Sequence, residues 1–418
     1  METTTKTKMI WSWALYDWAN SAFATTIMAG FFPLFFKAYW SHGFSVTEST
    51  YALGVANSVA SFFIALASPP LGAIADEGSY RKRFLLLFTA VGVGASAALA
   101  FVGQGQWFSA VLIYSLGVIG FTMALTFYDA LLVQVASEAQ FDRVSGLGYG
   151  LGYLGGGLLF SVNVLMYQKP EWFYLSDATS GILASFVTVA AWWAFFSLPI
   201  FVFVPEPLAL HPNNFLNATF SGFKSLKDQI LKLRHQPSLL FFLLGYLFYI
   251  DGVNTIVKMA VDYGISIGLE PADLIKALLL VQFVGFPSAI FFGFIGEKIG
   301  PRRGIWLCLV TYLGVTIYAY QIQTAGQFYL LAAIIGLVQG GIQSLSRSYF
   351  ARLVPPEESA QYFGFFNMVG KFSSILGPIL VATTGLWFNN PRAGILVLIL
   401  FFVVGGSFLS RSQALEKK

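Results

Sequence analysis

The chain has 418 residues, of which 56% are hydrophobic and only 11% are charged. A soluble globular protein carries about a quarter charged residues, so the composition excludes an ordinary water-exposed surface over most of the chain. The single cysteine, Cys308, excludes a disulfide framework. The three histidines (His42, His211 and His235) all lie in polar stretches, which argues against a histidine metal site or a histidine-dependent hydrolase.

The N-terminal segment has a basic flank followed by a long apolar run. A cleavable signal peptide has a similar charge pattern. This run is too long for one, it contains Asp17 and Asn20, and it lacks a convincing cleavage site of small residues. We therefore predict that the segment is the first membrane-spanning helix.

Apolar runs of comparable length recur along the rest of the chain. A membrane-spanning helix needs about 20 mainly apolar residues. Twelve such runs are present, at residues 11–37, 50–75, 84–103, 107–136, 144–166, 179–204, 238–264, 272–296, 304–323, 327–351, 360–387 and 393–410. Transmembrane strands would instead alternate over segments of about 10 residues. The pattern predicts an all-α polytopic membrane protein with twelve transmembrane helices.

The basic residues indicate how these spans are oriented. Lysine and arginine concentrate at both ends of the chain, at residues 81–83 and between residues 205 and 237. The opposite side carries little beyond Lys37, Lys169, Lys276 and Arg392. Cytoplasmic loops hold an excess of Lys and Arg, so both termini are predicted to be cytoplasmic. No organelle-targeting segment is visible, which favours a bacterial inner membrane.

A polar segment at about 205–237 divides the chain into two six-helix bundles, 1–204 and 238–418. The segment opens with VPEPLALHP, whose prolines cannot continue a helix. Farther along, Phe220, Phe223, Leu226 and Ile230 recur at helical spacing, with lysines on other faces. We therefore predict a cytoplasmic linker that includes a short amphipathic helix on the inner leaflet.

The two bundles share an internal repeat. Gly72-Ala-Ile-Ala-Asp76 precedes the basic run Arg81–Arg83, and Gly293-Phe-Ile-Gly-Glu297 precedes Arg302 and Arg303. In the first helix of each bundle, Asp17-x-x-Asn20-Ser21 matches Asp251-x-x-Asn254-Thr255. Parallel repeats about an axis normal to the membrane form the central site of one class of transporter. The repeat therefore predicts a site between two pseudo-symmetric halves.

The glycine, the acid four residues later and the basic cluster resemble the signature of the major facilitator superfamily. The first copy departs from it, because Glu77 replaces a basic residue and the spacing before Arg81 is longer. The second copy is nearer to the pattern. The glycine lets two helices approach closely, and the acid lies beside cations at a helix end. We expect these residues to latch the cytoplasmic side closed and to separate as the halves rock: Asp76, Arg81, Arg83, Glu297, Arg302 and Arg303.

A narrower resemblance is carried by WSWALYDWANSAFATTI, DGVNTIVKMAVDYG, GLVQGGIQSLSRSYFARLVP and FFGFFNMVGKFSSILGP. These segments are similar to the vacuole effluxer branch of the superfamily, whose eukaryotic members are associated with amino-acid export from the vacuole. The resemblance implies a major facilitator fold in which helices 1, 4, 7 and 10 line a central cavity. It does not fix the substrate.

Ionisable groups inside a membrane span are costly and by default mark function. Asp251 lies roughly 20 Å along its helix from Pro237, and Lys371 is similarly deep. Asp17 and Asp129 each lie roughly 13 Å from the cytoplasmic ends of their helices. These residues, with their helical neighbours, are the candidates for binding substrate or a proton: Asp17, Asn20, Asp129, Asp251, Asn254, Thr255 and Lys371. On helix 7, Asp251, Asn254 and Thr255 share one face with Lys258.

A structural interpretation stays open beside the functional one. The three acids Asp17, Asp129 and Asp251 are matched in number by Lys258, Arg347 and Lys371, as ion pairing requires. Lys258 lies in the outer half of its helix. Arg347 is five residues from Arg352 and is predicted to snorkel to the interface. For Arg347 and Lys258 the structural role is the favoured one.

The sequence thus predicts a secondary active transporter that works by alternating access and is coupled to protons. Its substrate would be a small polar solute such as an amino acid, with the carboxylate at Lys371 and the ammonium at Asp17 or Asp251. Asp251 would carry the coupling proton or form the substrate's principal anionic contact, with Asp17 as its pseudo-symmetric partner. An exporter of drugs, siderophores or lipid-like molecules, a channel and a non-transporting sensor remain alternatives. We expect a monomer in the bilayer, with no metal, cofactor or nucleic-acid partner.

Overall fold

The computed structural model describes residues 2–208, 215, 217–222, 224, 236–388 and 390–416. Within these residues, twelve helices are long and apolar enough to cross a membrane. The predicted number of spans is therefore confirmed, and the chain is an integral multi-pass membrane protein.

The helices fall into an N-terminal and a C-terminal half. The N-terminal half consists of α1 (Glu2–Ala22), η1 (Phe23–Phe31), α2 (Phe32–Phe35), η2 (Phe36–Trp40), α3 (Val46–Gly78), α4 (Arg81–Leu99), α5 (Trp107–Ala130), α6 (Leu132–Val135), η3 (Glu138–Gln140), α7 (Phe141–Gln168), η4 (Pro170–Phe173) and α8 (Ala178–Phe203). The C-terminal half consists of α10 (Pro237–Ser266), α11 (Pro271–Ile299), α12 (Pro301–Tyr320), α13 (Ala325–Leu353), η5 (Pro356–Glu358), α14 (Ser359–Trp387), α15 (Pro391–Leu396) and α16 (Leu398–Glu416).

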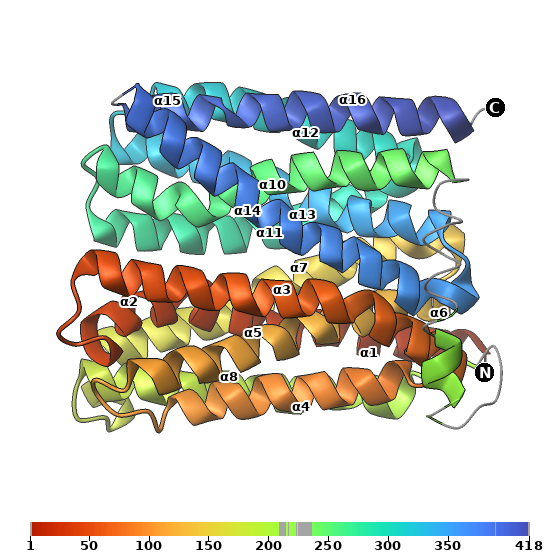
Figure 1. Ribbon diagram of the computed structural model, residues 1–418, viewed down its shortest axis with the longest axis horizontal. Helices are drawn as coiled ribbons and strands as arrows, with labels where there is room; N and C mark the ends of the chain where they lie inside the picture. Colours follow the sequence, from red (N-terminus) through yellow and green to blue (C-terminus); the bar gives the residue numbers. More distant parts are fainter. Residues whose placement is uncertain are drawn as a thin grey trace.

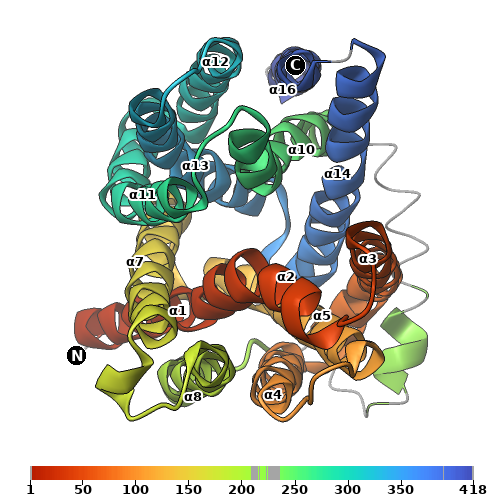
Figure 2. The same ribbon diagram turned by 90° about the vertical axis from the view of Figure 1, so that its left-hand side faces the viewer.

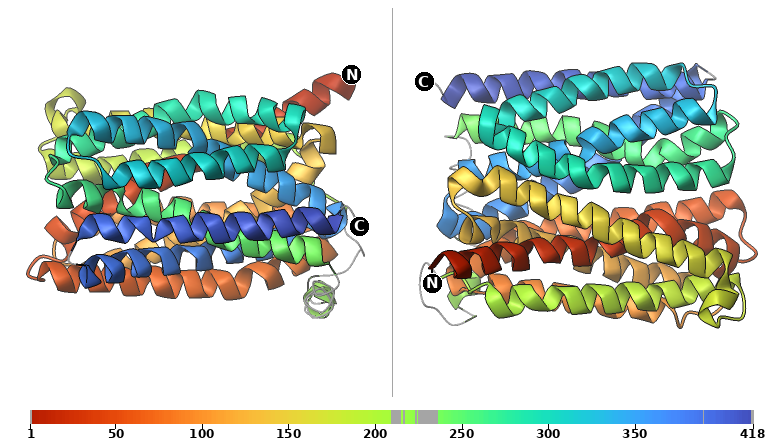
Figure 3. Two further views of the ribbon diagram at one scale, coloured as in Figure 1. Left: turned by 90° about the horizontal axis from the view of Figure 1, so that it is seen from above. Right: turned by 180° about the vertical axis from the view of Figure 1, so that it is seen from behind.

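The two halves lie side by side with their long helices nearly parallel, and the two ends of the chain lie at the same end of the bundle (Figure 1). The two further views show the same placement of the termini (Figure 3). We call this end the terminal side. The end view shows α7 beside α11 and α3 beside α14, so these two helix pairs join the halves (Figure 2).

Several helices extend beyond the apolar runs that predict them. The first span reaches from Thr5 to Trp40, because α1 continues through the π-helical segments η1 and η2 without a break. The second runs through Pro69 and Pro70 and ends at Gly78, and the next residue, Ser79, has a left-handed φ of 56°. Apolar composition therefore predicts the central part of each span, whereas several of the helices continue beyond it.

The glycine of each repeated motif lies where a helix of one half crosses a helix of the other. A Cβ added at Gly72 would collide with the backbone of Ala360 at the start of α14. A Cβ at Gly293 would lie 3.0 Å from the carbonyl oxygen of Asp142 at the start of α7. Small residues let helix backbones approach closely. The repeat thus makes equivalent contacts at both crossings.

The described part of the linker packs against the N-terminal half. Both carboxylate oxygens of Glu206 accept from the backbone N–H of Lys82 at 3.1 Å, which caps the start of α4. Burial raises the pKa of the Glu206 carboxyl. Residues 217–222 are helical. Of the predicted amphipathic positions, Phe220 is exposed, whereas Phe223, Leu226 and Ile230 lie outside the described residues.

Candidate functional site

A buried ionic cluster joins the two halves near the terminal side. Arg347, on α13 of the C-terminal half, is 1% exposed. Its Nη1 donates to Asp129 Oδ1 on α5 at 3.0 Å and to Asp17 Oδ2 on α1 at 3.2 Å. Its Nη2 donates to Asp17 Oδ2 at 3.3 Å. One guanidinium therefore holds two carboxyl groups of the other half.

Aromatic rings and neutral donors complete the surroundings of this cluster. The Arg347 guanidinium lies 4.8, 5.5 and 4.2 Å from the ring centroids of Trp13, Tyr128 and Tyr149. The Tyr128 hydroxyl donates to Asp17 Oδ2 at 2.8 Å. Ring faces attract a desolvated cation, which helps to offset the cost of burying the arginine.

The prediction that Arg347 snorkels to the interface is wrong. The side chain points across the bundle instead of along its helix, because the Asp17 and Asp129 carboxyls lie directly opposite. Its Nε donates to Ser145 Oγ at 2.9 Å and its Nη2 donates to the Ser145 carbonyl at 3.0 Å. Distance from the helix end, which the sequence supplies, does not reveal what a neighbouring half places in front of a side chain.

Asp251 occupies the equivalent position in the C-terminal half. Both of its carboxylate oxygens accept from the backbone N–H of Gly377 at 3.1 Å, and Oδ1 accepts from the Thr255 hydroxyl at 3.2 Å. A Cβ at Gly377 would lie 2.6 Å from Asp251 Oδ1, as a Cβ at Gly148 would lie 2.6 Å from Asp17 Oδ2. Each acid of the repeat therefore packs against a glycine of the fifth helix in its own half.

The two acids differ in their charge partners. Asp17 has the arginine, whereas Asp251 has no ion pair within 4 Å among the described side chains. Lys258, two helical turns farther along α10, interacts with Asp251 electrostatically at longer range. On α1, Asn20 is 2% exposed and its Nδ2 has no hydrogen-bond partner in the described part of the chain.

Two lysines of the C-terminal half lie within membrane spans. Lys258 on α10 is exposed and Lys371 on α14 is partly exposed, and their ammonium groups lie within electrostatic range of each other. Neither has an ion pair with any described residue. Lys371 opens into a cavity of about 560 Å³ between α3 and α14, lined by Ser58, Val59, Ser61, Phe62, Phe63, Lys371 and Phe372. Lys371 therefore places a positive charge beside a cavity where the halves meet, with Lys258 within electrostatic range on α10.

The first copy of the repeated motif forms a direct contact between the halves. Asp76 accepts from the N–H groups of Ala360 at 3.1 Å and Gln361 at 2.8 Å, at the start of α14. It also accepts from Arg81 Nε at 2.6 Å. Arg81 donates in turn to the carbonyls of Pro356 and Glu357 at 3.1 and 2.5 Å. The start of a helix favours an anion, so the Asp76 carboxylate stabilises this contact between the halves.

The remaining residues of the predicted latch lie apart from this contact. The Arg83 guanidinium lies over Tyr80, 5.2 Å from the ring centroid, within the N-terminal half. Glu297 and Arg303 are exposed, and Arg302 lies over Tyr349 at 4.7 Å. In the second crossing, the contact between halves is made instead by Asp142 and Arg352.

Asp142 and Arg352 are two residues that the sequence does not single out as a pair. Arg352 Nη2 lies 2.8 Å from Asp142 Oδ2, and the Asp142 side chain is fully buried. Ser348 also donates to Asp142. Both charged residues lie near helix ends, where a charge is usually solvated. Only the crossing of α7 with α11 and α13 shows that Asp142 is enclosed.

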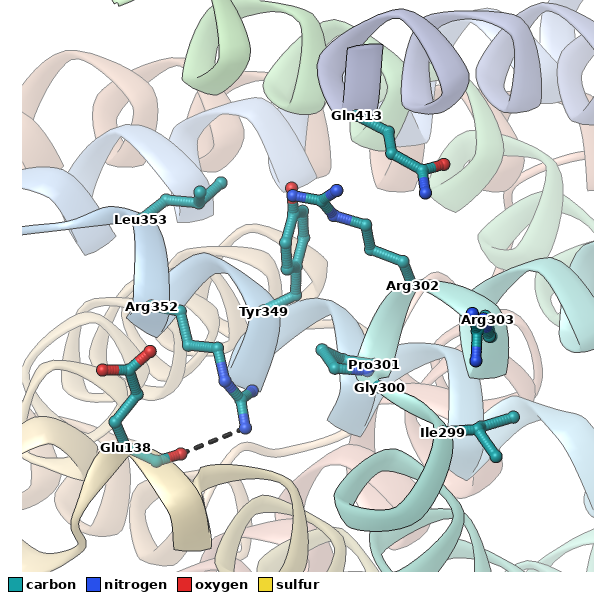
Figure 4. Close-up of a pocket in the computed structure, with 10 residues that line it drawn as sticks. All are labelled: Glu138, Ile299, Gly300, Pro301, Arg302, Arg303, Tyr349, Arg352, Leu353 and Gln413. Carbon is teal, nitrogen blue, oxygen red and sulfur yellow. Dashed lines mark hydrogen bonds between the residues drawn. The ribbon is translucent and has the colours of Figure 1, made fainter. Parts of the chain in front are cut away.

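A cationic pocket of about 480 Å³ lies beside this pair on the terminal side. Figure 4 shows Arg352 reaching the backbone oxygen of Glu138, at 3.0 Å, and Arg302 alongside Tyr349. The pocket is lined by Glu138, Ile299, Gly300, Pro301, Arg302, Arg303, Tyr349, Arg352, Leu353 and Gln413.

The family model described as "Vacuole effluxer Atg22 like" matches residues 39–414. The chain belongs to this family. A Bacillus subtilis (strain 168) relative, named as the uncharacterized MFS-type transporter YxiO, is 38% identical over 96% of this chain and 93% of its own length. Autophagy-related protein 22 of Eremothecium gossypii is 21% identical over 94% of this chain and 88% of its own length. The predicted Atg22-like branch and the predicted superfamily are confirmed, and the chain is a major facilitator transporter.

Solved structures show the same fold. The human organic anion transporter MFSD10 aligns over 97% of this chain and 99% of its own, with a TM-score of 0.73 and 15% identity. FucP in the outward conformation aligns over 97% of this chain and 98% of its own, with a TM-score of 0.70 and 12% identity. The predicted arrangement of twelve helices in the major facilitator fold of this Atg22-like chain is therefore confirmed.

Proposed function

We propose that the chain is a proton-coupled secondary transporter of a small solute that carries a carboxylate, such as an amino acid. The observation that carries this proposal is the pair Lys258 and Lys371. Two cations within electrostatic range of each other and without an ion pair to a described residue are costly inside a span, and such residues mark substrate or ion pathways. The cavity of about 560 Å³ beside Lys371, where α3 of one half meets α14 of the other, provides room for a small solute.

The same surroundings supply groups for the substrate's ammonium. Asn254 lies one turn from Asp251 and Lys258 on α10, is partly exposed, and has no hydrogen bond with any described residue. Asp251, which is 1% exposed, adds negative potential behind it. In this arrangement the carboxylate binds at the lysines and the ammonium lies toward Asn254 and Asp251. A zwitterionic substrate therefore has a partner for each of its two charges.

Alternating access follows from where the halves are joined. All three ion pairs that link the halves among the described side chains lie toward the terminal side: Arg347–Asp17, Arg347–Asp129 and Arg352–Asp142. With the terminal side cytoplasmic, as the basic residues predict, this conformation faces outward. Transport then requires these contacts to separate, and the buried acids of the cluster are suited to couple that step to a proton.

The orientation can be tested by cysteine labelling in a Cys308→Ala background, since Cys308 is buried. Ser79→Cys lies in the turn between α3 and α4, and His42→Cys lies between the first two spans on the opposite side. We expect a membrane-impermeant thiol reagent to label His42→Cys from outside intact cells and to label Ser79→Cys only after permeabilisation. Labelling of Ser79→Cys in intact cells would overturn the orientation.

Uptake into proteoliposomes tests the proposed substrate class. With an imposed pH gradient, the wild-type chain is expected to accumulate amino acids. Hydrogen bonds to charged groups contribute about 1.5–3 kcal/mol, so Lys371→Gln and Lys258→Gln should each raise KM roughly 10- to 100-fold. The rise in KM caused by these variants should be smaller for an uncharged solute that lacks a carboxylate.

The matched control is Lys276→Gln, because Lys276 is 66% exposed and pairs with Asp273 near the start of α11. Its KM should equal that of the wild type. If an organic anion without an ammonium group accumulates with the same KM as an amino acid, the lysines remain the proposed carboxylate site, but the proposal that the substrate is a zwitterion fails. Unchanged KM in both lysine variants would exclude the site.

A further inference from the structure

The cluster around Arg347 contains two acidic groups and one cation. Arg347 Nη1 donates to both Asp17 and Asp129, so the two carboxyl groups approach the same nitrogen. Asp17 and Asp129 are each 5% exposed and Arg347 is 1% exposed. If both carboxyls were ionised, the cluster would hold one uncompensated negative charge away from water.

The other polar partners of the cluster are neutral. Asp17 accepts from the Tyr128 hydroxyl at 2.8 Å, and Asp129 Oδ2 accepts from the Asn367 amide at 3.4 Å. The other titratable groups within electrostatic range in the described part of the chain are tyrosines: Tyr16, Tyr128, Tyr149, Tyr153 and Tyr246. Among the described residues, no second cation compensates the charge there. Two carboxyls that share one desolvated site retain one proton between them.

We propose that Asp17 and Asp129 share one proton while the terminal side is closed, and that opening the terminal side releases it. The inference rests on the proposed function, since it names the site of the coupling proton. Arg347 belongs to the C-terminal half and both acids belong to the N-terminal half. When the halves separate, water reaches the two carboxyl groups and both can ionise. The shared proton then leaves toward the terminal side.

Asp251 has a different role in this mechanism. Its carboxylate belongs to the C-terminal half alone, and its hydrogen bonds to Gly377 and Thr255 stay within that half. Separation of the halves breaks none of them. Asp251 is therefore assigned to the substrate stripe, and the proton to the cluster that spans both halves.

Infrared difference spectroscopy, which compares the purified full chain in ordinary water and in heavy water, tests directly whether the cluster holds a protonated carboxyl. A protonated carboxyl gives a carbonyl band that shifts in heavy water. If the proton is shared, the band should disappear in Asp17→Asn and also in Asp129→Asn, because the remaining carboxylate pairs with Arg347. Asp251→Asn should retain it. A band lost only in Asp251→Asn, or lost in just one of the cluster variants, would overturn the proposal.

A second measurement follows the gate and does not depend on substrate. Ser359 is fully buried at the start of α14 and donates to the Ala130 carbonyl of the other half at 3.1 Å. In a Cys308→Ala background, maleimide labelling of Ser359→Cys reports opening of the terminal side. Rates are divided by those of the unfolded chain at the same pH, which removes the titration of the thiol.

The closed state binds one proton more than the open state, so lower pH should slow this normalised labelling by up to about tenfold per pH unit. The dependence should vanish in Asp129→Asn and in Asp17→Asn. Asp142→Asn is the control, because it removes a gate carboxylate that has its own arginine; labelling should quicken while the pH dependence stays. A retained pH dependence in both cluster variants contradicts the shared proton, even if the transported solute proves to be something other than an amino acid.

Discussion

Arg347→Met is expected to lower the free energy of unfolding by about 3–5 kcal/mol, because removal of one partner of a buried ion pair leaves an unpaired charge. Two carboxyl groups lose their common donor, and three aromatic rings lose the cation between them. Methionine keeps much of the length of the side chain, so the loss reflects charge more than packing. Thermal unfolding in detergent, followed by tryptophan fluorescence, measures it.

Neutralising the acids should reverse most of this loss. Replacement of a buried ionic group by uncharged residues of similar size is often neutral or stabilising. The triple variant Arg347→Met, Asp17→Asn and Asp129→Asn should therefore unfold near the wild-type temperature. Arg303→Met, at an exposed arginine on α12, is the matched control and should leave unfolding unchanged. A triple variant as unstable as Arg347→Met would show that packing, and not charge, accounts for the loss.

The sequence predicts the architecture well because each span is determined by residues that are close together in the chain. Twelve apolar runs give twelve helices, and the repeated Asp-x-x-Asn pair predicts that Asp17 and Asp251 are equivalent, whereas their packing against Gly148 and Gly377 is seen only in the structure. These features depend on helical periodicity and on residues a few positions apart. They need no knowledge of which helix lies opposite.

The charge partners could not be predicted in the same way. Arg347 and Asp17 are 330 positions apart, and their contact depends on how α13 crosses α1 in the closed terminal side. The same holds for Asp142, which looks like an ordinary charged residue at a helix start but is fully enclosed by the other half. The equal number of acids and bases indicates that ion pairs form. Only the fold shows that Arg347 pairs with two acids, and that Lys258 and Lys371 form no ion pair with a described acidic residue.

Asp76→Asn should open the terminal side. The carboxylate accepts two N–H groups at the start of α14 and the Arg81 side chain, and asparagine keeps one oxygen and no charge. Hydrogen bonds to charged groups contribute about 1.5–3 kcal/mol, so the open population should rise roughly 10- to 100-fold. Ser348→Cys in a Cys308→Ala background reports it, since Ser348 is buried on α13 and lies away from the helix start that Asp76 holds.

Glu297→Gln provides a matched control within the same molecule. Glu297 is the acid of the second motif copy, four residues after Gly293 as Asp76 is four residues after Gly72, but its side chain is exposed. Its neutralisation should leave the labelling rate of Ser348→Cys unchanged. If both variants accelerate labelling equally, the acid acts through long-range charge and not through the start of α14. If neither does, Asp142 and Arg352 hold the terminal side closed without the first motif.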